Sequence, residues 1–217
     1  HWAGQGVLAL RMNVHAYDPP TDPQALLLVY SNLNETATYN RHGAPDREAY
    51  YYRKSILGID RAIQWMASRP DWDGKHLVVT GSSQGGGFSL ILAGFSPLVT
   101  AAGAHVPALC DHAAYQAERS SGWPNLVQGI GQGAEEYLVF SRYYDAVNFA
   151  RRIRVPTAVS VGFIDRTCSP GSVYAAYNQI EAPKKIWNGP LMPHSPSREM
   201  QQRMDAWLKE QLGIHER

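Results

Sequence analysis

The sequence predicts an α/β protein with a mostly parallel sheet and helices on both faces of that sheet. Two features indicate this fold class. Short apolar runs alternate with segments of helical periodicity along the chain, as they do where crossover helices join parallel strands. One such run, at residues 76–80, enters a glycine-rich corner that opens directly into an apolar helix. The 217 residues, 44% of them hydrophobic, can bury one core, so we expect a single domain over residues 1–217.

The first 46 residues are expected to contain one strand and a long irregular stretch. Residues 6–14 form an apolar run that reads as a buried strand. Residues 17–23 are polar and interrupted by prolines, so no regular structure is expected there. Residues 24–46 mix an apolar patch with Asn, Thr and Gly. We interpret them as an excursion over the functional site.

A helix is expected next, with Asp46 as its N-cap and Pro70 ending it after Arg69. Apolar residues in this segment recur at spacings of three and four, which places them on one helical face: Ile56, Ile59, Ile63 and Met66.

The corner itself reads Gly81-Ser82-Ser83-Gln84-Gly85. A Gly-x-Ser-x-Gly pattern between a strand and a helix is the nucleophile elbow of the α/β-hydrolases. The turn exposes the serine hydroxyl, and the glycines keep Cβ atoms out of a crowded corner. The N–H of the following residue, Gln84, then points toward the oxyanion of an acyl substrate.

The chain after the corner continues to alternate strands and helices. Strands are expected at residues 99–106, 154–164 and 185–187, and helical segments at 137–152 and 172–181. Residues 110–133 are aromatic and glycine-rich without a period, as in an insertion. A final helix should bury one stripe: Met200, Met204, Trp207, Leu208 and Leu212.

Three residues fit a catalytic triad. A serine hydroxyl needs a base within hydrogen-bond reach, and that histidine needs an acid to fix its tautomer. In α/β-hydrolases the order along the chain is serine, acid, histidine, at the ends of successive strands. Ser83, Asp165 and His194 follow this order.

Other acids and histidines fit less well. Asp111 follows the strand next to the elbow, and Asp145 precedes its strand. His105 and His112 come before the proposed acid and break the order. His215 belongs to a polar tail.

The sequence also resembles carbohydrate esterase family 7, which holds the acetyl xylan esterases and the cephalosporin C deacetylases. The resemblance rests on five motifs in order: DREAYYYR at 46–53, GSSQGGG at 81–87, YYDAVNFA at 143–150, SVGFID at 160–165 and VYAAYN at 173–178. It implies a serine carboxylesterase that removes acetyl groups from sugar hydroxyls, such as those of xylo-oligosaccharides, through an acyl-enzyme. Its triad falls on Ser83, Asp165 and His194, with the Gln84 N–H as one oxyanion donor.

The resemblance also implies that the domain is incomplete at its N-terminus. The family's second oxyanion donor lies on a Tyr-bearing loop, and this chain would start downstream of that loop and of the first strands of the sheet. Residues 13–18 replace an Arg-Gly-Gln-Gly-type turn, and Ser195-Pro196-Ser197 stand where the family has Glu and glycines. We therefore expect a divergent member. Because family members assemble into ring-like oligomers, the resemblance also implies a homo-oligomer.

Two other functions stay open at this stage. A triad of this order also serves peptide hydrolysis in prolyl-oligopeptidase-like enzymes. The chain could instead be a non-catalytic remnant of a hydrolase, in which missing strands leave an open sheet edge that pairs with another segment.

Composition excludes several classes of partner. A net charge of +1, with no basic stripe, argues against nucleic acid or an anionic membrane surface. No apolar run approaches the roughly 18 residues of a membrane span. Cys110 and Cys168 match neither a disulfide scaffold nor a zinc spacing, and we expect buried free thiols. The mechanism needs no metal or organic cofactor, and the sequence leaves the cellular compartment open.

Overall fold

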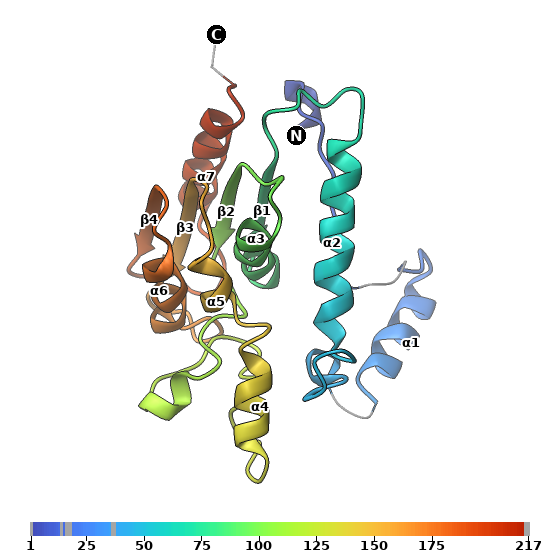
Figure 1. Cartoon of the computed structure of the whole chain (residues 1–217), viewed down its shortest axis with the longest axis vertical. Helices are drawn as coiled ribbons and strands as arrows, with labels where there is room; N and C mark the ends of the chain where they lie inside the picture. The colour runs from blue at the N-terminus through green and yellow to red at the C-terminus, as the bar shows by residue number, and fades with distance from the viewer. Residues whose placement is uncertain (1, 14, 16–18, 36–37, 215–217) are drawn as a thin grey trace.

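The computed structural model describes the chain except residues 1, 14, 16–18, 36–37 and 215–217. Its centre is a parallel sheet of four strands in the order β1-β2-β3-β4. These are β1 (Val78–Ser82), β2 (Ala101–His105), β3 (Thr157–Gly162) and β4 (Lys184–Gly189). Each strand pairs in parallel with the next along the chain, and β1 forms one edge (Figure 1). The predicted α/β class is confirmed.

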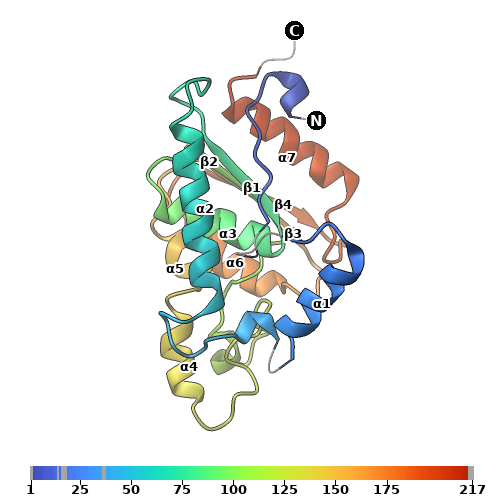
Figure 2. The same ribbon diagram turned by 90° about the vertical axis from the view of Figure 1, so that its right-hand side faces the viewer.

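Helices cover both faces of this sheet (Figures 1 and 2). On one face lies α7 (Arg198–Gln211), and on the other lie α3 (Gln84–Phe95), α5 (Ala146–Ala150) and α6 (Pro170–Gln179). The helix α2 (Tyr51–Ala67) packs against the outer side of α3. Small residues in β2 let the layers approach closely, because a Cβ on Gly103 would lie 2.8 Å from Met204 Sδ of α7. Four of the five residues expected in the buried stripe of this helix are buried, and Leu212 is half-buried just beyond its end.

The predicted strand at residues 6–14 is wrong for its described part. A short 3₁₀ turn, η1 (Ala3–Gln5), is followed by irregular chain, in which Leu10 and Met12 are exposed. An apolar run becomes a strand only if its backbone finds a partner strand, and no strand of the described sheet pairs with it.

The region 24–46 is more regular than expected. It contains α1 (Pro23–Leu33) and the 3₁₀ turn η2 (Tyr39–Arg41). Asp22 caps α1 through a hydrogen bond from the Ala25 N–H. Pro23 occupies the first turn, where a helix tolerates proline because its N–H has no intrahelical partner.

The start of α2 lies later than predicted. Asp46 is not its N-cap: its carboxylate accepts the N–H groups of Glu48 and Ala49 in a preceding turn, and the helix begins at Tyr51. The predicted apolar face is correct, since Ile56 and Ile63 are buried.

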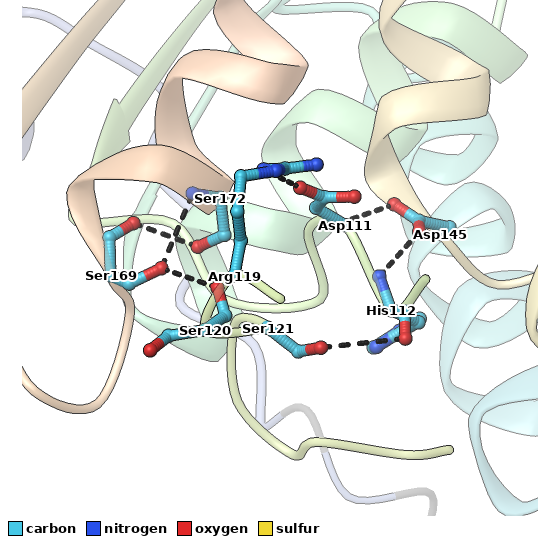
Figure 3. A network of polar contacts seen from close by, with 8 residues as sticks. All are labelled: Asp111, His112, Arg119, Ser120, Ser121, Asp145, Ser169 and Ser172. Atoms are coloured by element: carbon cyan, nitrogen blue, oxygen red, sulfur yellow. Dashed lines mark hydrogen bonds and ion pairs between the residues drawn. The ribbon is translucent and has the colours of Figure 1, made fainter. Parts of the chain in front are cut away.

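The helical segment expected at 137–152 is two helices, α4 (Ala134–Ser141) and α5. Asp145 separates them, because its carboxylate caps α5 through the Val147 N–H and also accepts the N–H groups of Asp111 and His112. The insertion 110–133 is largely irregular, apart from η3 (Ala114–Ala117). Figure 3 shows how polar contacts hold it: Arg119 pairs with Asp111, and Ser169, the N-cap of α6, donates to the Ser120 carbonyl.

Within the described residues, no helix has both the length and the apolar character needed to cross a membrane.

Candidate active site

Ser83 stands at the corner between β1 and α3. Its backbone has φ 54° and ψ −117°, a conformation that strains a residue with a Cβ. The strained turn is held by two backbone hydrogen bonds, from the Ser83 N–H to the His105 carbonyl and from the Ala108 N–H to the Ser83 carbonyl, both 2.9 Å. Gly81 is required by space, since a Cβ there would lie 2.5 Å from the Gly85 carbonyl carbon. The corner therefore has the form of a nucleophile elbow.

The structure brings Ser83, Asp165 and His194 together. His194 Nε2 lies 2.8 Å from Ser83 Oγ, and His194 Nδ1 lies 2.8 Å from Asp165 Oδ2. Asp165 can only accept at this contact, which assigns the proton to Nδ1 and leaves Nε2 to accept from the serine hydroxyl. A hydroxyl, an imidazole and a carboxylate are thus joined in one hydrogen-bonded series.

Asp165 is fixed in the turn that follows β3. Its side chain is fully buried, and Oδ1 accepts the N–H groups of Thr167 and Cys168 at 2.8 and 2.9 Å. These bonds satisfy one oxygen and leave the other for His194. A buried carboxylate held in this way keeps one orientation.

The loop after β4 positions His194. Met192 anchors this loop, because its side chain is buried with Val106 and Met200. The loop also presses against the end of β3, where a Cβ on Gly162 would lie 2.2 Å from the Met192 carbonyl oxygen. The turn carrying Asp165 and the loop carrying His194 therefore meet with no space for a side chain between them.

Gln84 begins α3, and the first N–H groups of a helix have no intrahelical acceptor. Its side chain Oε1 accepts a hydrogen bond of 3.2 Å from the Tyr39 hydroxyl. Gln84 Nε2 is buried and finds no hydrogen-bond partner within the described part of the chain. The excursion at 24–46 thus does reach the elbow, through Tyr39.

Cys168 lies beside Asp165 and His194. Burial, and after it the charge of Asp165, raises the pKa of its thiol to about 12. Both cysteines are buried and free, as expected. The sequence offered no sign that this thiol lies beside Asp165 and His194, because their proximity depends on the turn after β3.

The other acids and histidines that were weighed as members of the triad make different contacts. Asp111 pairs with Arg119, and Asp145 caps α5 and binds the backbone of the insertion (Figure 3). His105 Nδ1 contacts Ser160 Oγ at 2.7 Å. His112 is buried with neither ring nitrogen paired among the described residues. His215 lies outside the described residues.

Comparison with known proteins agrees with this geometry. The family model of acetyl xylan esterase (AXE1) matches residues 1–211. A protein of Xylanibacter ruminicola named acetyl esterase Axe7A is 36% identical over 211 residues, which are 97% of this chain and 48% of that protein. The chain therefore spans about half the length of this curated relative.

Solved structures agree on the fold. An acetyl xylan esterase from a Paenibacillus species is 27% identical with a TM-score of 0.69, over 76% of this chain and 54% of that one. Acetyl xylan esterase 1 from a Thermoanaerobacterium species is 25% identical with the same TM-score, over 77% of this chain and 56% of that one. A puromycin hydrolase at 19% identity and a TM-score of 0.62 shares the fold alone, over 77% of this chain and 28% of its own.

The fold is that of the α/β-hydrolases, as the elbow sequence predicted. Since the family model covers residues 1–211, nearly the whole chain, this protein belongs to the acetyl xylan esterase family.

Proposed function

We propose that this chain carries the catalytic residues of a serine esterase that hydrolyses acetyl esters of carbohydrates such as xylo-oligosaccharides. The observation that supports it most directly is the hydrogen-bonded series Ser83, His194, Asp165. Membership of the acetyl xylan esterase family supports the substrate class, and so does the relative named an acetyl esterase.

In the proposed first step, Ser83 Oγ attacks the acetyl carbonyl carbon while its proton passes to His194 Nε2. The buried Asp165 carboxylate stabilises the imidazolium through Nδ1–H. The negative oxygen of the tetrahedral intermediate accepts a hydrogen bond from the Gln84 N–H at the start of α3. The C–O bond to the sugar then breaks, and the sugar oxygen takes the proton from Nε2.

The second step regenerates the enzyme. Water gives a proton to His194 Nε2 and attacks the acetyl-serine carbonyl, and the second tetrahedral intermediate expels Ser83 Oγ, which regains the proton. Acetate leaves. Each step uses one proton held at His194, so the reaction balances without a redox or metal cofactor.

The test is acetate release from 4-nitrophenyl acetate and from acetylated xylan. Ser83→Ala should lower kcat by roughly 10³- to 10⁶-fold, because only binding and oxyanion effects remain. Ser82→Ala, one position earlier on the same turn, is the matched control and should stay within a few-fold of the unaltered chain. Undiminished release by Ser83→Ala would overturn the proposal.

The non-catalytic alternative predicts a different result in a labelling experiment. A fluorophosphonate probe should attach to Ser83 of the unaltered chain, and mass spectrometry of the peptide should locate it. An unlabelled serine together with absent acetate release would favour the remnant hypothesis.

Substrate preference distinguishes the peptidase alternative from the proposed esterase. Family membership supports esters, so a panel of short peptide amides should be cleaved far more slowly than 4-nitrophenyl acetate. Preferential cleavage of peptides would favour a prolyl-oligopeptidase-like activity.

A further inference from the structure

Three donors of different chemistry meet beside the elbow: Asp165, Cys168 and His194. Each offers one ligand atom, and these atoms all lie within 4.8 Å of one another. Asp165 and Cys168 are buried, and the His194 side chain is 30% exposed. Carboxylate oxygen, imidazole nitrogen and thiolate sulfur are the ligands that zinc accepts in proteins.

From this cluster we propose an inhibitory zinc site, formed by the Asp165 carboxylate, the Cys168 thiolate and the His194 imidazole. The site is separate in chemistry from the proposed hydrolysis, which uses Asp165 and His194 without a metal. Cys168 has no part in that reaction. Together with Asp165 and His194 it completes a set of three ligands.

The required movements are small. Zinc–ligand bonds of about 2.0–2.3 Å in a tetrahedral site place ligand atoms roughly 3.3–3.8 Å apart. Asp165 Oδ2 and His194 Nδ1, now 2.8 Å apart, would separate slightly, and the longest distance in the cluster would shorten by about 1 Å to reach that range. The adjustment would come from rotation of the His194 side chain, which is 30% exposed and gives the ion a path from solvent.

The remaining ligands are already oriented. Asp165 Oδ1 accepts the N–H groups of Thr167 and Cys168, so the carboxylate is held while Oδ2 stays available. The same bond from Cys168 fixes the backbone of the thiol residue against the carboxylate. With Nδ1 as the ligand nitrogen, Ser83 stays on the Nε2 side of the imidazole, and a water can fill the fourth coordination position.

The charges balance in the buried site. Zn²⁺ displaces the thiol proton to solvent, and the metal with one carboxylate, one thiolate and a neutral imidazole has no net charge. Burial of this neutral set avoids the cost of an isolated buried charge. The proton of His194 moves from Nδ1 to Nε2 when Nδ1 binds zinc, so the imidazole can no longer accept the proton of Ser83. This is the physical basis of the inhibition.

Binding is tested by calorimetric titration of Zn²⁺ into Ser83→Ala, which keeps all three ligands and needs no enzymatic activity. We expect one zinc per chain with micromolar or tighter affinity. Adding Cys168→Ala should weaken binding at least tenfold, whereas Cys110→Ala, which removes the other buried thiol, should leave it unchanged. No binding, or equal affinity with and without Cys168, overturns the proposal.

A spectroscopic test does not require a substitution of the buried Cys168. Co²⁺ bound to Ser83→Ala should show a near-ultraviolet thiolate-to-cobalt charge-transfer band, which Cys110→Ala retains. Stoichiometric cobalt binding without this band would show that no cysteine ligates the metal, and the proposed site would be wrong.

The inhibition itself rests on the proposed function. In the unaltered chain, saturating Zn²⁺ should lower acetate release more than tenfold, and EDTA should restore it. Failure of the esterase assay would leave the calorimetric and cobalt results intact, so the two proposals fail separately. Zinc bound through Cys168 without loss of activity would overturn the inhibitory role.

Discussion

The hydroxyl of Tyr39 donates a hydrogen bond of 3.2 Å to Oε1 of Gln84, and so joins η2 to the first turn of α3. Behind Tyr39 lies Tyr52, which is buried and whose ring contacts the Tyr39 ring edge-on, with centroids 6.4 Å apart. Burial raises the pKa of both phenols, so the Tyr39 hydroxyl keeps the proton that it donates to Gln84. We therefore expect Tyr39 to orient the Gln84 side chain next to Ser83.

Tyr39→Phe should lower kcat about five- to tenfold with KM nearly unchanged, because one hydrogen bond of about 1 kcal/mol that orients Gln84 is lost while the ring stays in place. Steady-state kinetics on 4-nitrophenyl acetate measure kcat and KM separately. Tyr143→Phe removes a hydroxyl bound by Arg47 and should leave kcat unchanged. An effect on KM alone would assign Tyr39 to substrate contact instead.

Asp165→Asn should lower kcat by roughly 10³- to 10⁴-fold with the fold intact, because an amide no longer stabilises the imidazolium or fixes its tautomer. Asp111→Asn is the control, since Asp111 pairs with Arg119. Acetate release and circular dichroism check both variants. Equal losses in the two would mean that Asp165 has only a structural role.

Gly162→Ala should reduce kcat while the chain stays folded, because the added Cβ would lie 2.2 Å from the Met192 carbonyl oxygen and 2.7 Å from that of Pro193. The loop must move, and His194 moves with it. Gly58→Ala places its Cβ in open space on α2 and should stabilise the helix by about 0.5–1 kcal/mol. Kinetics and thermal unfolding compare the two, and unchanged kcat in Gly162→Ala would contradict the proposed coupling.

His112 makes the fold sensitive to acid. Burial lowers its pKa, against the smaller opposing effects of Asp145 and Asp111. The unfolded chain therefore binds a proton below about pH 6.5 while the folded chain does not, and the free energy of unfolding falls as pH decreases through this range, by up to about 1.4 kcal/mol per pH unit.

His112→Phe should remove this part of the pH dependence and keep the backbone bond to Asp145. Urea unfolding at pH 7.5, 6.5 and 5.5 measures it. A slope equal to that of the unaltered chain would show that other groups cause the acid sensitivity.

The sequence predicted the elbow, the strands that follow it and the three residues of the series, because each depends on local patterns. Gly81 to Gly85 read directly as a turn between a strand and a helix. Asp165 and His194 follow strands of a parallel sheet, and the carboxyl ends of such strands meet at one edge.

The contacts of Tyr39 and Cys168 could not be predicted, because they join segments far apart in the chain through tertiary packing. The strand expected at residues 6–14 failed for a related reason. Its apolar pattern is real, but a strand requires a partner, and hydrophobicity alone does not supply one.

The position of β1 at the edge of the described sheet has a consequence for how Ser83 is supported. In the described part of the chain, β2 is the sole strand neighbour of β1, and Ser83 is tied to His105 and Ala108 on that same side. Within the described residues, the backbone of Ser83 is thus held from the side of β2 and by the Gly87 N–H of α3. Backbone amides of β1 that point away from β2 should exchange with deuterium faster than those of β2. A segment that paired with that side of β1 would also restrain the backbone of Ser83.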